Sequence, residues 1–234
     1  EVLDCTFYNC HPSSTDSIVS ISSIFNVLFS NNTFDSIKDG RPTPALYIQY
    51  YSRNVEISHN RFLNCDSYQP LRPAIRFAGE VPPPSYVPSA VFKFNYNYLK
   101  NVGSNKLGVF LFSLNNQQSP IEFCHNEMDG CINLNANDNG FLCDIERIPD
   151  TGFEFHNFTF RNCRSYATYG GGPLLFLNYN NVNSRTFENL TFINNQAAIG
   201  GGSGIVITGV TNEILFTNCQ FIDNELIGES GGAI

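Results

Sequence analysis

The stretch Ile214-Leu215-Phe216-Thr217-Asn218-Cys219-Gln220-Phe221-Ile222-Asp223-Asn224 decides how the rest of this 234-residue chain is interpreted. It holds an apolar residue, a polar turn, a second apolar residue five places on, and a Cys, Asn or apolar residue three places later. The pattern occurs eight times. Its first apolar column is Val2, Phe29, Ile57, Phe94, Phe123, Phe155, Phe187 and Phe216, and its second is Phe7, Phe34, Phe62, Leu99, Met128, Phe160, Phe192 and Phe221. Such self-similarity, at a period of about 20–50 residues, indicates a solenoid, a propeller or a repeat array.

The second half of each repeat is a variable loop followed by a short apolar segment. Examples are Ala45-Leu46-Tyr47-Ile48, Val109-Phe110-Leu111-Phe112 and Gly204-Ile205-Val206-Ile207. These segments are β-branched or aromatic and are bounded by Gly, Pro, Asn and Asp, as strands are. No long run combines a helical period with capping signals. About three short strands per repeat and no helix predict an all-β chain, a right-handed parallel β-helix of about eight coils.

The continuous repeat predicts one domain over residues 1–234. Solenoids need polar caps, because an uncapped end exposes unpaired strand edges. The chain starts within a motif and stops at Gly232-Ala233-Ile234, partway into a strand. We therefore expect a segment of a longer solenoid that is uncapped at both ends.

The motif also predicts what lies inside the coils and at their bends. Phe7, Phe34, Phe62, Phe160, Phe192 and Phe221 are expected to stack in the interior. Between the two apolar columns, four successive repeats carry Asn32, Asn60, Asn97 and Asn126. Asparagine tolerates the left-handed conformation of a sharp bend, and amides stacked at about 4.8 Å can bond as a ladder. We predict that these four residues stack at one inter-strand turn.

Composition and motifs exclude several classes of function. The net charge of −8 and the lack of a basic stripe argue against a nucleic-acid partner. No apolar run is long enough to insert in a membrane. The glycine runs precede no helix and no P-loop lysine, and no Cys-x-x-Cys pair occurs, so we expect no cofactor and no metal.

The eight cysteines leave two interpretations open. Cys10, Cys65, Cys131 and Cys163 share the last motif column, where burial as a small hydrophobe is favoured. Cys131 and Cys163 lie on adjacent rungs, however, at a spacing that permits a disulfide. An even cysteine count in a secreted chain hints at such pairing.

Three N-glycosylation sequons begin at Asn31, Asn157 and Asn189, all in one column beside the expected ladder. An asparagine-rich chain produces sequons by chance. The shared outward position nevertheless favours these three residues as glycosylation sites.

The C-terminal repeats resemble a known family. Phe192-Ile193-Asn194-Asn195 and Phe221-Ile222-Asp223-Asn224 are similar to the F-x-x-N repeat of the chlamydial polymorphic outer-membrane proteins (Pmp), and Gly231-Gly232-Ala233-Ile234 is similar to their G-G-A-I repeat. Related repeats occur in large surface proteins of parasitic protists, often with cysteine in place of the final Asn, as at Cys163. The clear match covers the last third of the chain; earlier repeats depart from the glycine pair, as at Pro73-Ala74-Ile75. The resemblance implies a secreted or cell-surface, extracellular passenger that acts as an adhesin or a structural scaffold.

The alternative is a polysaccharide-degrading β-helix enzyme of the pectate lyase or glycoside hydrolase kind. Such a site needs two clustered carboxylates, or calcium ligands with a base. The best constellation is Asp138, Asp144, Glu146 and Arg147, and the other acidic residues are scattered. His59, His125 and His156 recur near the turn and are interpreted as exposed polar filler. We therefore predict no catalytic residues and a non-enzymatic function.

The largest insertion, between Cys65 and Val91, is the predicted contact surface. Long loops on a rigid solenoid usually carry recognition, and Tyr and Arg are typical interface anchors. We predict that a protein or glycan ligand on a cell surface, or a neighbouring copy in an assembly, contacts Tyr68, Arg72 and Tyr86. The competing interpretation is that this loop folds back over the coil.

Overall fold

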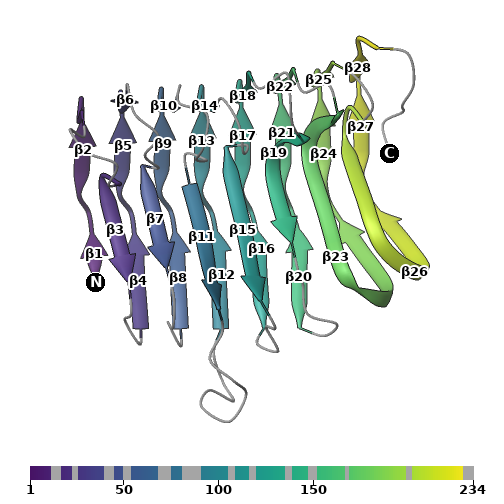
Figure 1. Ribbon diagram of the computed structural model, residues 1–234, viewed down its shortest axis with the longest axis horizontal. Helices are drawn as coiled ribbons and strands as arrows, with labels where there is room; N and C mark the ends of the chain where they lie inside the picture. The colour runs from purple at the N-terminus through teal and green to yellow at the C-terminus, as the bar shows by residue number, and fades with distance from the viewer. Residues whose placement is uncertain are drawn as a thin grey trace.

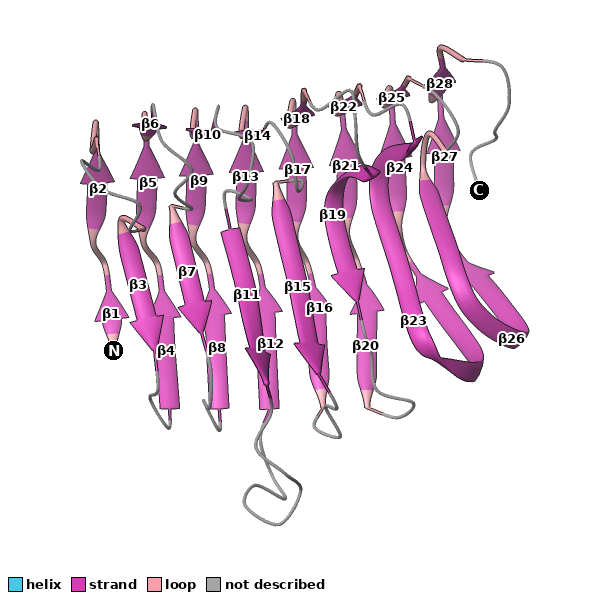
Figure 2. Ribbon diagram, viewed as in Figure 1, coloured by secondary structure: helices cyan, strands magenta, loops and turns pink. Residues whose placement is uncertain are grey.

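The structure is a computed structural model that describes residues 1–11, 17–22, 26–39, 45–49, 54–67, 75–80, 91–104, 109–115, 120–134, 139–146, 152–166, 169–198 and 202–228. Every described regular element is a β-strand, as Figure 2 shows, and all strand pairs are parallel. The coils stack along one axis from the N-terminus to the C-terminus (Figure 1). The predicted all-β class and parallel β-helix are therefore confirmed.

Each coil contains strands at four positions. The first position is occupied by β1 (Val2–Leu3), β4 (Asn26–Ser30), β8 (Asn54–Ser58), β12 (Val91–Asn95), β16 (Ile121–Cys124), β20 (Phe153–His156) and the C-terminal parts of β23 (Tyr169–Glu188) and β26 (Ile205–Thr217). The second is the eight-stranded sheet of β2 (Thr6–Tyr8), β5 (Thr33–Asp35), β9 (Arg61–Leu63), β13 (Tyr98–Lys100), β17 (Glu127–Asp129), β21 (Thr159–Arg161), β24 (Thr191–Ile193) and β27 (Gln220–Ile222).

The third position is a seven-stranded sheet of two-residue strands: β6 (Lys38–Asp39), β10 (Asp66–Ser67), β14 (Gly103–Ser104), β18 (Ile132–Asn133), β22 (Arg164–Ser165), β25 (Gln196–Ala197) and β28 (Glu225–Leu226). The fourth holds β3 (Val19–Ser22), β7 (Leu46–Gln49), β11 (Ile75–Glu80), β15 (Phe110–Asn115), β19 (Asn139–Glu146) and the N-terminal parts of β23 and β26. The described residues thus form six complete coils with a partial coil at each end, which refines the predicted count of about eight.

The phenylalanine stack fills the interior as predicted. Ring centroids lie 4.6 Å apart for Phe7 and Phe34, and 4.9 Å apart for Phe34 and Phe62. Phe192 continues the stack at 5.0 Å from both Phe160 and Phe221. Strand register places these residues directly opposite one another, so one repeat stacks on the next at the strand spacing.

The predicted asparagine ladder is also confirmed. The backbone N–H of Asn32 donates to Oδ1 of Asn60 (2.9 Å), that of Asn60 to Oδ1 of Asn97 (3.0 Å), and that of Asn97 to Oδ1 of Asn126 (2.9 Å). Each Nδ2 donates to the backbone carbonyl of a first-column residue one coil earlier, for example from Asn60 to Phe29 at 3.0 Å. At this bend the backbone has no strand partner. The side-chain amides therefore bond to the N–H groups and the carbonyl groups that the strands leave unpaired.

The conformational reason given for these asparagines is wrong, because the left-handed residue is the one before each of them. Positive φ angles occur at Asn31 (57°), His59 (58°), Tyr96 (57°) and His125 (58°). The ladder residues are buried and bond to backbone, whereas the preceding residue makes the bend. The bend and the hydrogen bonds to the backbone are therefore made by two different, adjacent residues.

A second amide ladder, which the sequence analysis did not predict, lies at the bend between the second and third positions. The backbone N–H of Cys163 donates to Oδ1 of Asn195, and that of Asn195 to Oδ1 of Asn224, both at 3.0 Å. Nδ2 of Asn195 donates to the carbonyl of Phe160 (3.0 Å). We call the bend before the second strand of each coil the first corner and the bend after it the second corner.

Candidate functional site

The outer face of the first-position strands carries the most chemically varied side chains among the described residues. Side chains alternate across a strand, so the residues on either side of each inward first-column residue point outward. Strand register aligns them in two columns: Leu28, Glu56, Lys93, Glu122 and Glu154 in one, and Ser30, Ser58, Asn95, Cys124, His156 and Glu188 in the other. We call this surface the outer face.

An ion pair fixes one part of the outer face. Nζ of Lys93 lies 3.0 Å from Oε2 of Glu122, and Nδ2 of Asn95 donates to Oε1 of the same carboxylate at 2.6 Å. The hydrogen bond that Lys93 donates to Glu122 raises the pKa of Lys93, which keeps the ammonium charged. Oδ1 of Asn95 accepts the backbone N–H of Cys124 at 2.8 Å, so this network also holds the strand that carries Cys124.

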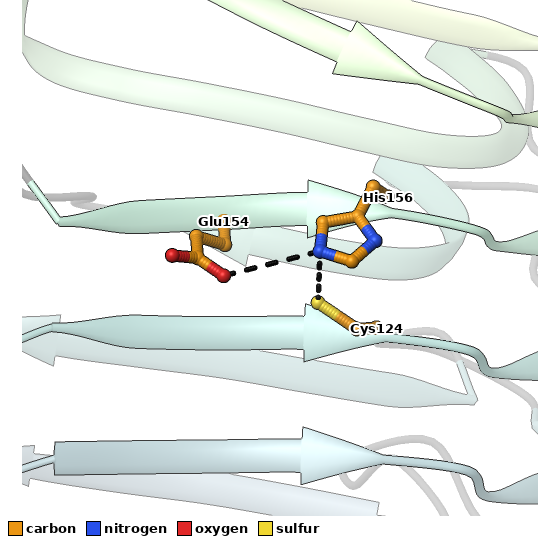
Figure 3. A group of neighbouring side chains, drawn as sticks. All are labelled: Cys124, Glu154 and His156. Carbon is orange, nitrogen blue, oxygen red and sulfur yellow. Dashed lines mark hydrogen bonds and ion pairs between the residues drawn. The ribbon is translucent and has the colours of Figure 1, made fainter.

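Cys124, Glu154 and His156 meet beside this pair and are called the Cys124 cluster (Figure 3). Sγ of Cys124 lies 3.0 Å from Nε2 of His156, and Oε2 of Glu154 lies 3.9 Å from the same nitrogen. Cys124 on β16 and His156 on β20 are direct cross-strand partners, and Glu154 precedes His156 by two residues on the same face. Cys124 is 1% exposed, while the Glu154 side chain is 65% exposed.

The environment makes Cys124 a poor nucleophile. Burial, and after it the negative charges of Glu122 and Glu154, raise the pKa of its thiol from 9.0 to about 12. A thiol attacks as the thiolate, and reactive cysteines lie in electropositive, partly exposed surroundings. The Cys124 cluster therefore does not favour covalent catalysis.

Around the cluster, histidine rings line the first corner. His59 stacks on Tyr96 with centroids 4.9 Å apart, and Tyr96 stacks on His125 at 4.6 Å. Nδ2 of Asn157 lies 2.8 Å from Nδ1 of His156 and 3.3 Å from Nε2 of His125. His59 and His125 are exposed, as predicted, whereas His156 is half-buried. The rings also stack on or bond to neighbours in adjacent coils, which the interpretation as filler did not include.

The sequence carries a signal for the cluster just outside the motif columns. Glu122-Phe123-Cys124 and Glu154-Phe155-His156 are the flanks of the first apolar column in successive repeats. Once a column residue points inward, its two neighbours point outward, and register places the two triplets side by side. The outward positions, and not the motif positions, hold the reactive groups.

The predicted disulfide between Cys131 and Cys163 is not formed in the structure, where both are free thiols. Sγ of Cys131 donates to the carbonyl of Leu99, and Sγ of Cys163 to that of Met128, each at 3.5 Å. Burial raises the pKa of Cys163 well above its ordinary value, so the thiol stays protonated and remains a donor. Both cysteines are fully buried, as the hydrophobic interpretation predicts.

The three sequon asparagines all occupy the left-handed position of the first corner, with φ angles of 57°, 53° and 53° for Asn31, Asn157 and Asn189. Asn31 and Asn189 are exposed, and Nδ2 of Asn31 bonds to Oδ1 of Asp4. Asn157 is half-buried, and its amide contacts two histidine rings. Glycosylation of all three stays a prediction, and Asn189 is the position best suited to it.

Several other predicted residues lie outside the described part of the chain. These are the contact residues Tyr68, Arg72 and Tyr86, together with Asp138 and Arg147 of the alternative enzyme constellation. Asp144 on β19 is half-buried, and only the backbone of Glu146 is described. The predicted contact surface and the predicted constellation are therefore not compared with side-chain positions.

Comparisons with known proteins add no relative: no protein-family model matches the chain, and no curated protein or solved structure is significantly similar to it. Among the described residues, no helix is long and apolar enough to cross a membrane.

Proposed function

We propose that this chain is a non-enzymatic β-helix scaffold that acts at a cell surface or after secretion, as an adhesin or passenger segment. The observation that supports this most is the rigid repetition of the coils. Amide ladders and buried thiols bond to the backbone at the corners, and the parallel ladders hold outward side chains in straight columns. Such a rod displays groups at the strand spacing of about 4.8 Å.

The extracellular location rests on the Pmp-like F-x-x-N repeats and on the shared position of the sequons. It is tested by secreting the chain from a eukaryotic host and treating it with an endoglycosidase. We expect an electrophoretic shift that Asn189→Gln reduces. Unmodified protein in the medium would contradict the glycoprotein part of the proposal.

Adhesion is tested by altering the predicted contact loop between Cys65 and Val91. The full chain, a variant lacking residues 79–89, and the matched substitutions Tyr68→Ala and Tyr86→Ala are compared for binding to host cells and glycan arrays. We expect the deletion to abolish binding without changing the melting temperature. Retained binding with a large drop in melting temperature would instead assign the loop to covering the coil.

The polysaccharide-degrading alternative is tested directly on pectin and other acidic polysaccharides. We expect no turnover above background by reducing-sugar and unsaturated-product assays. Turnover that Asp144→Asn or Glu146→Gln abolishes would replace the scaffold proposal with the enzyme.

A further inference from the structure

We propose that Cys124, Glu154 and His156 together bind a Zn²⁺ ion on the outer face. This inference goes beyond the scaffold function and does not depend on it. It starts from the convergence of three different donor atoms, each of a kind that zinc accepts, from two adjacent strands onto one point (Figure 3).

The donor set selects the class of metal. Thiolate, imidazole and carboxylate are the three ligand types of protein zinc sites, whereas calcium and magnesium prefer oxygen alone. The three donor atoms lie within 4.8 Å of one another. In a tetrahedral zinc site neighbouring S and N donors are about 3.5 Å apart. The observed 3.0 Å between Sγ and Nε2 is shorter than that value. The observed 3.9 Å between Nε2 and Oε2 is longer than the roughly 3.4 Å expected for neighbouring N and O donors, so the exposed Glu154 side chain has to move inward to bind.

The backbone preorganises this site. Cys124 and His156 are register partners in a parallel ladder, so their separation is set by strand pairing. Oδ1 of Asn95 holds the Cys124 backbone N–H at 2.8 Å. The Glu154 side chain is 65% exposed, so the site borders on solvent, and a water would be the fourth ligand of the ion.

Asn157 supplies a second shell by a simple rotation. A zinc ion on Nε2 leaves the ring proton of His156 on Nδ1, which then needs an acceptor. Nδ2 of Asn157 lies 2.8 Å from that Nδ1 and 3.3 Å from Nε2 of His125. Turning the amide by half a revolution places Oδ1 there, where it accepts an N–H from both rings.

The competing explanation is a metal-free hydrogen-bonded cluster. In that case Nε2–H of His156 donates to one acceptor, and the nearby Sγ and Oε2 compete for it. Zinc binding would release the thiol proton, and the positive charge of the ion would compensate the negative charges of the thiolate and of Glu154.

The test uses the full chain, reduced and stripped with a chelator, and titrates it with ZnCl₂ by calorimetry and with CoCl₂ by absorption. We expect one tight site per chain and a thiolate-to-cobalt charge-transfer band. Cys124→Ser and His156→Ala should each weaken Zn²⁺ binding by at least about 100-fold, and Glu154→Gln by about tenfold. The matched controls Cys143→Ser and His59→Ala, a buried cysteine and a corner histidine away from the cluster, should bind as the parent does.

A second variant keeps the proposal testable if a ligand substitution prevents folding. Asn157→Asp leaves every ligand in place and presents only acceptors to Nδ1–H, so it should tighten Zn²⁺ binding by about tenfold. Zn²⁺ should also raise the melting temperature of the parent and of Asn157→Asp. No binding by the parent, or equal binding by folded Cys124→Ser, would overturn the site. So would a cobalt spectrum without the charge-transfer band.

Discussion

The two halves of the solenoid close their bends at different corners. In the coils of β5, β9, β13 and β17, an amide occupies the first corner, at Asn32, Asn60, Asn97 and Asn126. In the coils of β24 and β27 the amides, Asn195 and Asn224, occupy the second corner instead. The first corner holds the buried Leu190 in the coil of β24, and in the coil of β27 it holds Cys219, whose Sγ donates to the carbonyl of Phe187. One corner of a coil can therefore carry the polar bonds while the other packs against the core.

The coil of β21, where the second half begins, shows that cysteine can take over one part of this role. It has Phe158 at the first corner and Cys163 at the second. Sγ of Cys163 donates to the carbonyl of Met128, and Nδ2 of Asn195 makes the corresponding bond to Phe160 in the next coil. A thiol donates but accepts only weakly, so it replaces the Nδ2 bond without the Oδ1 bond. This explains physically why both Asn and Cys occur in the column.

The largest expected effect is on the interior phenylalanine stack, which both halves share. Phe62 and Phe160 are both 0% exposed in the same stack, one in each half. Phe62→Ala and Phe160→Ala should each lower the free energy of unfolding by about 3–5 kcal/mol, because each opens a cavity between stacked rings. Equilibrium urea unfolding measures both. A cost confined to one variant would show that the halves differ in their cores and not only at their corners.

The next effect is specific to the corners. Asn97→Leu leaves the backbone N–H of Asn60 and the carbonyl of Ile57 without their bonds, and Asn195→Leu does the same to Cys163 and Phe160. We expect each substitution to lower the free energy of unfolding by about 2–3 kcal/mol.

Leucine itself fits a first corner, since Leu190 is buried there. The control Leu190→Ile should therefore cost less than about 1.5 kcal/mol. Hydrogen exchange of the Asn60 and Cys163 amides would locate the lost bonds. Unchanged protection at both amides would refute the ladder account.

A corner that carries a buried cysteine should make the free energy of unfolding sensitive to alkaline pH, whereas a corner that carries an asparagine should not. Burial raises the pKa of Cys65 from 9.0 to about 12. Between these values the unfolded chain loses the thiol proton and the folded chain keeps it, so stability falls as pH rises. Between about pH 9 and about pH 10.5 we expect Cys65 to lower the free energy of unfolding by about 1–2 kcal/mol. Melting curves in a reductant should show a shallower decline for Cys65→Ala than for the parent.

The smallest effect tests the exchange of thiol for amide. Cys163→Ala removes the bond to Met128 and should cost about 1 kcal/mol. Cys163→Asn should cost less than Cys163→Ala, because the new amide would extend the ladder of Asn195 and Asn224 by one coil. Thermal unfolding of both variants decides the order. If Cys163→Asn is less stable than Cys163→Ala, an amide cannot replace the thiol at this corner.

Much of the first-corner ladder could be predicted, because four asparagines recur in one column with fixed apolar flanks. The second ladder was missed, since Asn195 and Asn224 are only two residues and share their column with Cys163. The left-handed position was misassigned by one residue. Asparagine is common at both places, and only the backbone shows that Asn31 makes the bend while Asn32 makes the bonds.

By itself the sequence determined the parallel β-helix, the inward stack and the position of the first ladder, because a period in the chain becomes a column in space once strands pair in register. Tertiary structure alone decided the meeting of Cys124 with Glu154 and His156, and His156 lies 32 residues further along the chain. Their contact depends on which face each residue takes and on which strand lies beside it. Those choices are made by pairing between coils, whose register comes from the packed interior and not from the outward residues themselves.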